Sequence, residues 1–131
     1  MPPYNCVMEA IKKFEDLKCW QASRSLVKMI YQLSREGQLS KDFDLRSQFR
    51  HAGVSSMSNI AEGFGRFSSR EFIRYLEMSQ GSSQEVCSLT YVIEDQEYLS
   101  LDLVASIREA SELTKSLTLG LIRYINQRGT K

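Results

Sequence analysis

The sequence predicts an all-α protein folded as an antiparallel up-down-up-down four-helix bundle. Four long segments carry apolar residues at three- and four-residue steps, and short connections with glycine or serine separate them. No segment alternates apolar and polar residues as a β-strand does. Long helices joined by short connections pack as antiparallel neighbours. The chain of 131 residues, 42% of them hydrophobic and 25% charged, is long enough for one core without disulfides or metals.

The first two helices end at glycines. We expect the first from about Leu17 to Glu36, where Gly37 can supply a left-handed stop. We expect the second from about Asp44 to Phe64, with Gly65 as its terminator. Its inward-facing side chains are expected to be Leu45, Phe49, Ala52, Gly53, Ser56, Ile60 and Phe64.

The third helix has the clearest start. The Ser68 hydroxyl can accept from the Glu71 amide while the Glu71 carboxylate reaches back, which forms a capping box. Phe67 and Phe72 occupy the positions of a hydrophobic staple. The core face is expected to be Phe72, Leu76, Ser79, Ser83, Val86, Thr90 and Ile93, and the helix should end near Glu97.

The fourth helix is expected to start after Ser100 and to run to about Gln127, with Asp102 favourably placed in its first turn. Gly129 can close it. Its predicted inner face is Leu103, Ile107, Ala110, Leu113, Leu117, Leu121 and Tyr124.

Small residues gather where the second and third helices should meet. If this hairpin folds near Arg66, Gly53 lies level with Ser79 and Phe49 with Ser83. Glycine inside a helix costs up to ~1 kcal/mol relative to alanine, so close packing is one reason to find it there. The aligned small residues are Ala52, Gly53, Ser55 and Ser56 with Ser79, Gly81, Ser82 and Ser83.

Composition excludes several classes of protein. No run of residues is apolar and long enough to span a membrane, and the first residues lack the apolar stretch of a signal peptide, so we expect a cytoplasmic protein. Cys6, Cys19 and Cys87 show neither a disulfide framework nor metal-binding spacing, and they are expected to be small buried hydrophobes.

The net charge of +1 is unevenly distributed. Residues 77–112 carry one basic and eight acidic side chains, while residues 1–76 carry twelve basic and eight acidic ones. The molecule should therefore be electrically lopsided.

A family resemblance rests on the motif Asn59-Ile60-Ala61-Glu62-Gly63-Phe64-Gly65-Arg66. Further matches lie at Phe14-Glu15-Asp16-Leu17, Trp20-Gln21-Ala22, Leu26, Ile30-Tyr31, Leu33, Gln48, Arg50, Glu71, Arg74, Gly81-Ser82 and Glu85. The pattern resembles the 23S rRNA intervening-sequence proteins, which are small four-helix-bundle proteins of bacteria. The similarity covers residues 14–128, which we take as the bundle, with residues 1–13 as an extension and residues 129–131 as a tail.

The resemblance implies a homo-oligomer, with a ring-shaped pentamer favoured. Family members are similar in fold to the accessory protein of diversity-generating retroelements, which binds nucleic acid and a reverse transcriptase. RNA or a nucleic-acid enzyme is therefore a candidate partner, and the link to rRNA could be physical or only genetic. No cofactor is implied.

Two sets of residues could bind a nucleic-acid backbone. Arg66, Arg70 and Arg74 recur every four residues, and Arg46 and Arg50 form a second pair on the neighbouring helix. A solvated face neutralised by Glu62, Glu71 or Glu77 is the alternative for the first set. The motif residues Asn59, Glu62, Gly63, Gly65 and Arg66 could form a recognition surface or a local capping network in which both glycines adopt positive φ.

The third and fourth helices carry more apolar residues than one core can hold, which predicts self-association. Leu117, Leu121 and Ile125 share one side of the fourth helix, while Leu119 and Ile122 point away from it. The candidate interface residues are Leu119, Ile122, Met78, Leu89 and Val92.

Catalytic chemistry finds little support. His51 is the single histidine, and neither a nucleophile elbow nor inward Glu-x-x-His motifs are present. We therefore predict a non-enzymatic, self-assembling helical bundle that acts as an RNA-linked or protein-interaction module. The alternative is a small hydrolase or metal-dependent enzyme with a site at the end of the second helix.

Overall fold

The computed structural model describes residues 11–129, and within them it contains four long helices and no strand. The helices are α2 (Lys18–Leu33), α3 (Phe43–Phe64), α4 (Ser69–Asp95) and α5 (Leu101–Gly129). Short 3-10 turns, η1 (Phe14–Asp16) and η2 (Leu39–Lys41), precede α2 and α3. The predicted all-α four-helix bundle is confirmed. Residues 1–10 of the expected extension, Cys6 among them, and residues 130–131 of the tail lie outside the described residues.

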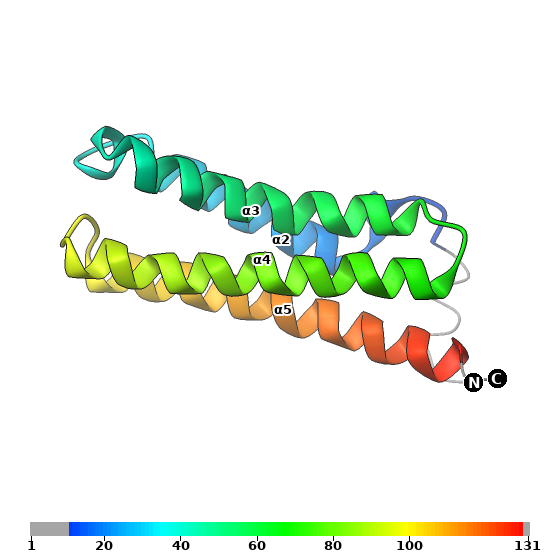
Figure 1. Cartoon of the computed structure of the whole chain (residues 1–131). Coiled ribbons are helices and arrows are strands. Elements are labelled where there is room, and N and C mark those ends of the chain that lie inside the picture. Colours follow the sequence, from blue (N-terminus) through cyan, green and yellow to red (C-terminus); the bar gives the residue numbers. More distant parts are fainter. Residues whose placement is uncertain (1–10, 130–131) are drawn as a thin grey trace.

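The helices form two layers. In Figure 1, α2 and α3 lie above α4 and α5, and successive helices run in opposite directions. The α2–α3 and α4–α5 connections share the left end, and the α3–α4 connection lies at the right end. None of the helices described in residues 11–129 is long and apolar enough to cross a membrane.

The predicted starts of α4 and α5 are confirmed by their caps. The Ser68 hydroxyl accepts from the Glu71 amide at 3.1 Å, and the Ser100 hydroxyl accepts from the Leu103 amide at 3.2 Å. Asp42 caps α3 by accepting from the Leu45 amide at 3.2 Å. Gly37 adopts φ +65, the left-handed stop expected after the first helix, although α2 itself already ends at Leu33.

Two local predictions at the α3–α4 connection are wrong. Gly65 has φ −79, and Gly37 is the one glycine with positive φ among the described residues, so Gly63 and Gly65 are not left-handed. The Phe67 side chain is fully exposed and makes no staple with Phe72. Phe72 instead packs edge-on against Phe64, with ring centroids 6.0 Å apart, because the aromatic ring at the end of α3 is the apolar surface within its reach.

The core consists of two apolar clusters. One lies toward the α2–α3 and α4–α5 connections and comprises Leu26, Ile30, Leu39, Leu45, Phe49, Ala52, Val86, Ile93, Val104 and Ile107. The other lies toward the α3–α4 connection and comprises Leu17, Cys19, Trp20, Ile60, Leu76, Ile122, Tyr124 and Ile125.

A layer of buried hydroxyl groups separates the two clusters. Its members are Ser23, Ser56, Ser79, Ser83, Ser111, Thr114 and Thr118. The Ser56 and Ser83 hydroxyls lie 2.7 Å apart, and the Ser111 hydroxyl donates to the Ser83 carbonyl at 2.8 Å. These bonds connect α3, α4 and α5 and satisfy polar groups whose burial would otherwise be costly.

This layer corrects the predicted alignment of α3 and α4. Ser79 lies against Ser56, with hydroxyls 3.2 Å apart, rather than level with Gly53. Gly53 instead faces α2, because a Cβ there would meet the Ile30 Cδ1 at 2.7 Å. Gly81 has open space around it, so close packing does not account for that glycine.

The inner face of α5 also differs from the prediction. Leu103 and Leu113, expected in the core, are exposed, whereas Ser111, Thr114 and Thr118 are fully buried. The Thr118 hydroxyl donates to the Thr114 carbonyl at 2.7 Å within the helix, which lets a polar side chain occupy the interior. The hydroxyl layer thus determines which side of α5 faces inward.

Candidate functional surfaces

Asn59 binds along α3 rather than capping its end. Its amide nitrogen donates to the carbonyl of Ser55 at 2.9 Å and to the Ser55 hydroxyl at 3.2 Å. The Ser55 hydroxyl in turn lies 2.9 Å from that of Ser82 on α4. Asn59 therefore supports the contact between α3 and α4, while Glu62 of the same motif is exposed.

Gly63 lies where α3 packs tightly against α4. A Cβ at this position would lie 2.7 Å from Tyr75 Cβ, 3.0 Å from Phe72 Cδ1 and 3.3 Å from the Phe72 carbonyl oxygen. Two of these atoms belong to the α4 backbone or are directly bonded to it. The motif glycine is thus required by helix packing.

Arg66 is held against α4 by an aromatic ring. Its Nη2 donates to the Tyr75 hydroxyl at 2.6 Å, and its guanidinium carbon lies 4.8 Å from the Tyr75 ring centroid. Arg66 and Gly63 therefore both contact the same turn of α4. In the structure, the motif residues pack the end of α3 and the connection after it against α4.

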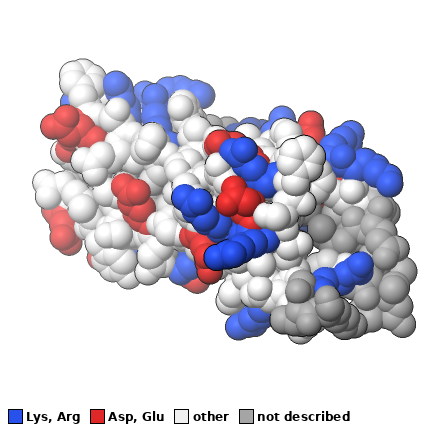
Figure 2. Space-filling view, turned by 45° about the vertical axis from the view of Figure 1, so that its right-hand side comes forward, with Lys and Arg blue, Asp and Glu red and all other residues white. Residues whose placement is uncertain are grey.

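Arg70 and Arg74 border a hollow at the start of α4. The hollow has a volume of about 760 Å³, and Glu71, Glu77 and Asn126 also line it. The Arg74 guanidinium lies 3.8 Å from the Glu71 carboxylate, with both side chains well exposed. On the face shown in Figure 2, Lys and Arg side chains alternate with Asp and Glu across the middle of the molecule instead of forming one basic band.

Arg46 and Arg50 point toward α2 and the α2–α3 connection. The Arg46 Nη1 donates to the Ser40 carbonyl at 2.7 Å, and its guanidinium carbon lies 4.8 Å from the Phe43 ring centroid. The Arg50 Nε donates to the Ser34 hydroxyl at 2.8 Å. Its guanidinium carbon lies 4.4 Å from the Tyr31 ring centroid.

Pairs of arginine and aromatic residues are a recurrent feature that sequence reasoning missed. The described pairs are Arg24 with Trp20, Arg46 with Phe43, Arg50 with Tyr31, Arg66 with Tyr75, Arg108 with Tyr91 and Arg128 with Tyr124. Three of them sit three or four residues apart on one helix, and this spacing was a detectable signal. Of the other three, two join different helices and one joins Arg66 of the α3–α4 connection to α4, so they became visible only in the fold.

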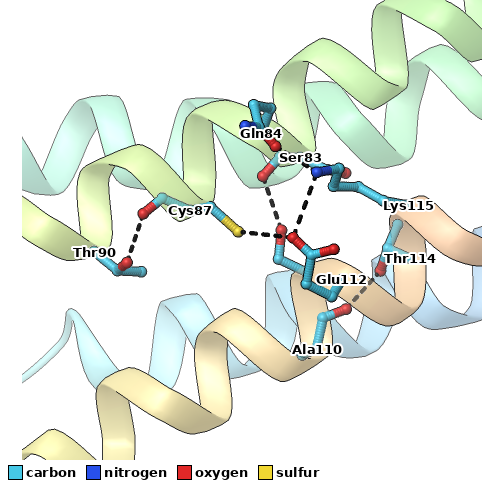
Figure 3. Close-up of polar contacts among 9 residues, drawn as sticks. Ser83, Gln84, Cys87, Thr90, Ala110, Glu112, Thr114 and Lys115 are labelled. Carbon is cyan, nitrogen blue, oxygen red and sulfur yellow. Dashed lines mark hydrogen bonds and ion pairs between the residues drawn. The ribbon is translucent and has the colours of Figure 1, made fainter.

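A polar groove of about 540 Å³ lies between α4 and α5. In Figure 3, Glu112 points toward both Cys87 and Lys115, and Lys115 also contacts Gln84. The Glu112 carboxylate lies 3.8 Å from the Cys87 sulfur and 3.4 Å from the Lys115 amine.

Further along this groove, Arg108 connects α5 to α4. Its Nε donates to the Thr90 hydroxyl at 2.9 Å, and its Nη2 pairs with the Glu94 carboxylate at 2.9 Å. The guanidinium carbon lies 3.8 Å from the Tyr91 ring centroid. These contacts join the two helices. The polar groups that line the groove therefore bind one another.

Groups capable of catalysis are dispersed. His51 is exposed on α3. Burial raises the pKa of the Cys19 thiol to about 11, although a hydrogen bond with Thr118 acts in the opposite direction, so this thiol is a poor nucleophile. Within residues 11–129, no three His, Cys, Asp or Glu side chains are grouped closely enough to hold a metal ion.

The candidate interface residues divide into two groups. Met78, Val92 and Leu119 are exposed as predicted. Ile122 is only 7% exposed and lies in the second core cluster, and Leu89 packs against the first. The prediction for Ile122 is wrong because the inner face of α5 is rotated from the one expected, which turns Ile122 toward Trp20 and its neighbours.

The chain resembles known proteins both in its fold and in its sequence. The chain is similar to a solved protein from Bacteroides thetaiotaomicron, described as a protein with unknown function from the S23 ribosomal protein family. The two share 21% sequence identity with a TM-score of 0.72, over 79% of this chain and 97% of that one. No curated protein sequence matches significantly. The sequence model of the 23S rRNA-intervening sequence protein family matches residues 15–119, and the chain therefore belongs to this family.

Proposed function

We propose that this protein is a non-enzymatic helical bundle that assembles with copies of itself and acts as an interaction module, with RNA or a nucleic-acid enzyme as its partner. The observation that carries the proposal is the apolar surface of α4 and α5. Exposed large apolar side chains on these two helices include Met78, Val92, Leu101, Leu113 and Leu119. Single exposed apolar residues are common, but several on two adjacent helices are typical of an interface.

The polar groups of the bundle support a role in binding rather than catalysis. The hydroxyl groups of the buried layer and the Arg108 guanidinium form hydrogen bonds with other groups of the fold. The partly exposed Cys87 has a carboxylate, Glu112, as its hydrogen-bond acceptor, with no histidine beside it. The end of α3, where an enzyme would place its site under the alternative, is occupied by the Gly63 and Arg66 packing contacts.

Self-assembly is tested by measuring the mass in solution. A repeated contact that closes on itself gives a ring, and the family resemblance favours five subunits. Five chains of 15.1 kDa make a particle of about 75 kDa. Light scattering at micromolar concentration should report such a multiple, and a monomer of 15.1 kDa would refute the proposal.

Variants identify the surface involved. Leu113→Glu combined with Leu119→Glu should dissociate the assembly and preserve the helical circular dichroism signal, because both side chains are exposed, at 55% and 37%. Ala105→Glu combined with Ser116→Glu adds the same charge at exposed positions of α5 and serves as the control. An assembly that tolerates the leucine variant would exclude this surface as the contact.

A further inference from the structure

We infer that one outer face of the bundle, built by α2 and α3, binds single-stranded RNA; the inference rests on the proposed role as an interaction module. We call this surface the α2–α3 face. Its defining residues are Arg24, Lys28, Tyr31, Phe43, Arg46 and Arg50.

Negative charge is scarce on these two helices. Helix α2 contains no Asp or Glu, and on α3 they occur only near the two ends, at Asp44 and Glu62. Half of the 16 acidic side chains lie in residues 77–112 of the other layer. The net charge of +1 therefore conceals a basic face that would attract a polyanion.

Neutral groups hold the arginines of this face. Arg46 donates to a carbonyl oxygen and Arg50 to a hydroxyl, and both lie over aromatic rings. The guanidinium of Arg24 lies 5.7 Å from the Trp20 ring centroid. Such partners orient a guanidinium without neutralising its charge. None of the ion pairs formed among residues 11–129 involves these arginines or Lys28.

Apolar surface lies beside the cations of this face. The Phe43 ring is 67% exposed and the Tyr31 ring is half-buried. A hollow of about 820 Å³ on the same face is lined by Val27 and Met57 together with Arg24 and Lys28, with Glu15 as its one carboxylate. Exposed rings and guanidinium planes can stack with unpaired bases, whereas the bases of a duplex are already stacked.

The size of the face suits a short strand. Trp20 and Tyr31 are eleven residues apart, so at ~1.5 Å per residue they lie roughly 16 Å apart along α2. The pair of Arg46 and Phe43 extends the face beyond Tyr31, toward the α2–α3 connection. For comparison, one OB fold that binds single strands takes ~4 to 16 nucleotides.

The other candidate set is less suited to a polyanion. Arg74 pairs with Glu71, and Glu77 lines the same hollow as Arg70. Arg66 is bound to the Tyr75 hydroxyl and ring. Phosphate binding there must compete with two carboxylates, a competition that the α2–α3 face largely lacks.

The test is fluorescence anisotropy with a fluorescein-labelled 15-nucleotide poly(U) RNA at several salt concentrations. We expect binding at 50 mM salt that Arg24→Gln with Lys28→Gln, and separately Arg46→Gln with Arg50→Gln, each weaken about tenfold. If each pair makes two phosphate contacts, the slope of log K against log salt becomes shallower by about 1.4. Tyr31→Leu with Phe43→Leu should weaken binding about fivefold or more with the slope unchanged, because it removes stacking and no charge.

Arg70→Gln with Arg74→Gln removes the same charge from α4 and is the matched control. Equal weakening by the control, or no binding at 50 mM salt, would overturn the inference. So would variants of the face that change the mass of the assembly and leave RNA affinity intact, because the face would then be a subunit contact. Mass in solution is measured separately, so self-assembly can stand when RNA binding fails. Arg24 and Lys28 are exposed side chains, which keeps the test valid if the Arg46 and Arg50 variant unfolds.

Discussion

The close approach at Gly63 gives a sharp test of the packing between α3 and α4. In Gly63→Ala, the new Cβ would lie 2.7 Å from Tyr75 Cβ, far inside normal contact. Tyr75 Cβ is bonded directly to the α4 backbone and cannot rotate away, so the two helices must separate. Overpacking of this kind costs about 1–3 kcal/mol, while the better helix propensity of alanine returns up to ~1 kcal/mol.

We expect a net loss of about 1–2 kcal/mol in the free energy of unfolding. For a chain of 131 residues this lowers Tm by roughly 4–8 °C. The assay is thermal and urea denaturation followed by circular dichroism at 222 nm. All variants are compared at one protein concentration, because assembly couples stability to concentration.

Gly81→Ala is the matched control on α4. No atom lies within 4 Å of a Cβ built there, so only the propensity gain remains and Tm should rise by a few degrees. The Tm of Gly53→Ala should lie between those of the other two variants, because the new Cβ would clash only with the flexible end of the Ile30 side chain. A Gly63→Ala protein as stable as the parent, with no gain in Gly81→Ala, would refute the reasoning.

Three further predictions concern stability. Ser68→Ala should cost about 0.5–2 kcal/mol, since it removes the acceptor for the Glu71 amide at the start of α4, and an unchanged urea midpoint would argue against the cap. Ile122→Ala should cost about 2–5 kcal/mol and Leu119→Ala less than about 0.5 kcal/mol in the dissociated protein, and comparable losses would contradict their assigned burial. The Cys19 thiol, with its pKa raised to about 11, stays protonated in the folded state where the unfolded thiol ionises. The stabilisation that this protonated thiol gives the folded state is fully present below about pH 9. As the pH rises from the unfolded pKa to the folded pKa, the free energy of unfolding falls by up to ~1.4 kcal/mol per pH unit. Urea denaturation between pH 8 and 11 should show a steeper decline for the parent than for Cys19→Ala, and parallel profiles would exclude the effect.

The sequence alone determined the elements of the fold. Helix periodicity and the caps at Ser68 and Ser100 depend on residues within one or two turns, so they can be recognised without tertiary structure. The antiparallel order of the helices followed, because short connections leave antiparallel packing as the available solution. The motif from Asn59 to Arg66 likewise indicated the family from the sequence alone.

Only the tertiary structure decided what the motif residues and the arginines contact. Gly63 faces Tyr75, and Arg50 faces Tyr31, across distances in sequence that no local pattern encodes. The inner face of α5 was misassigned for the same reason. Apolar content favoured Leu113, but the Ser83 carbonyl on α4 accepts from the Ser111 hydroxyl at 2.8 Å, and this bond keeps Ser111 inside. A buried polar group is stable only when partners from other helices satisfy it, and these partners exist only once the chain has folded.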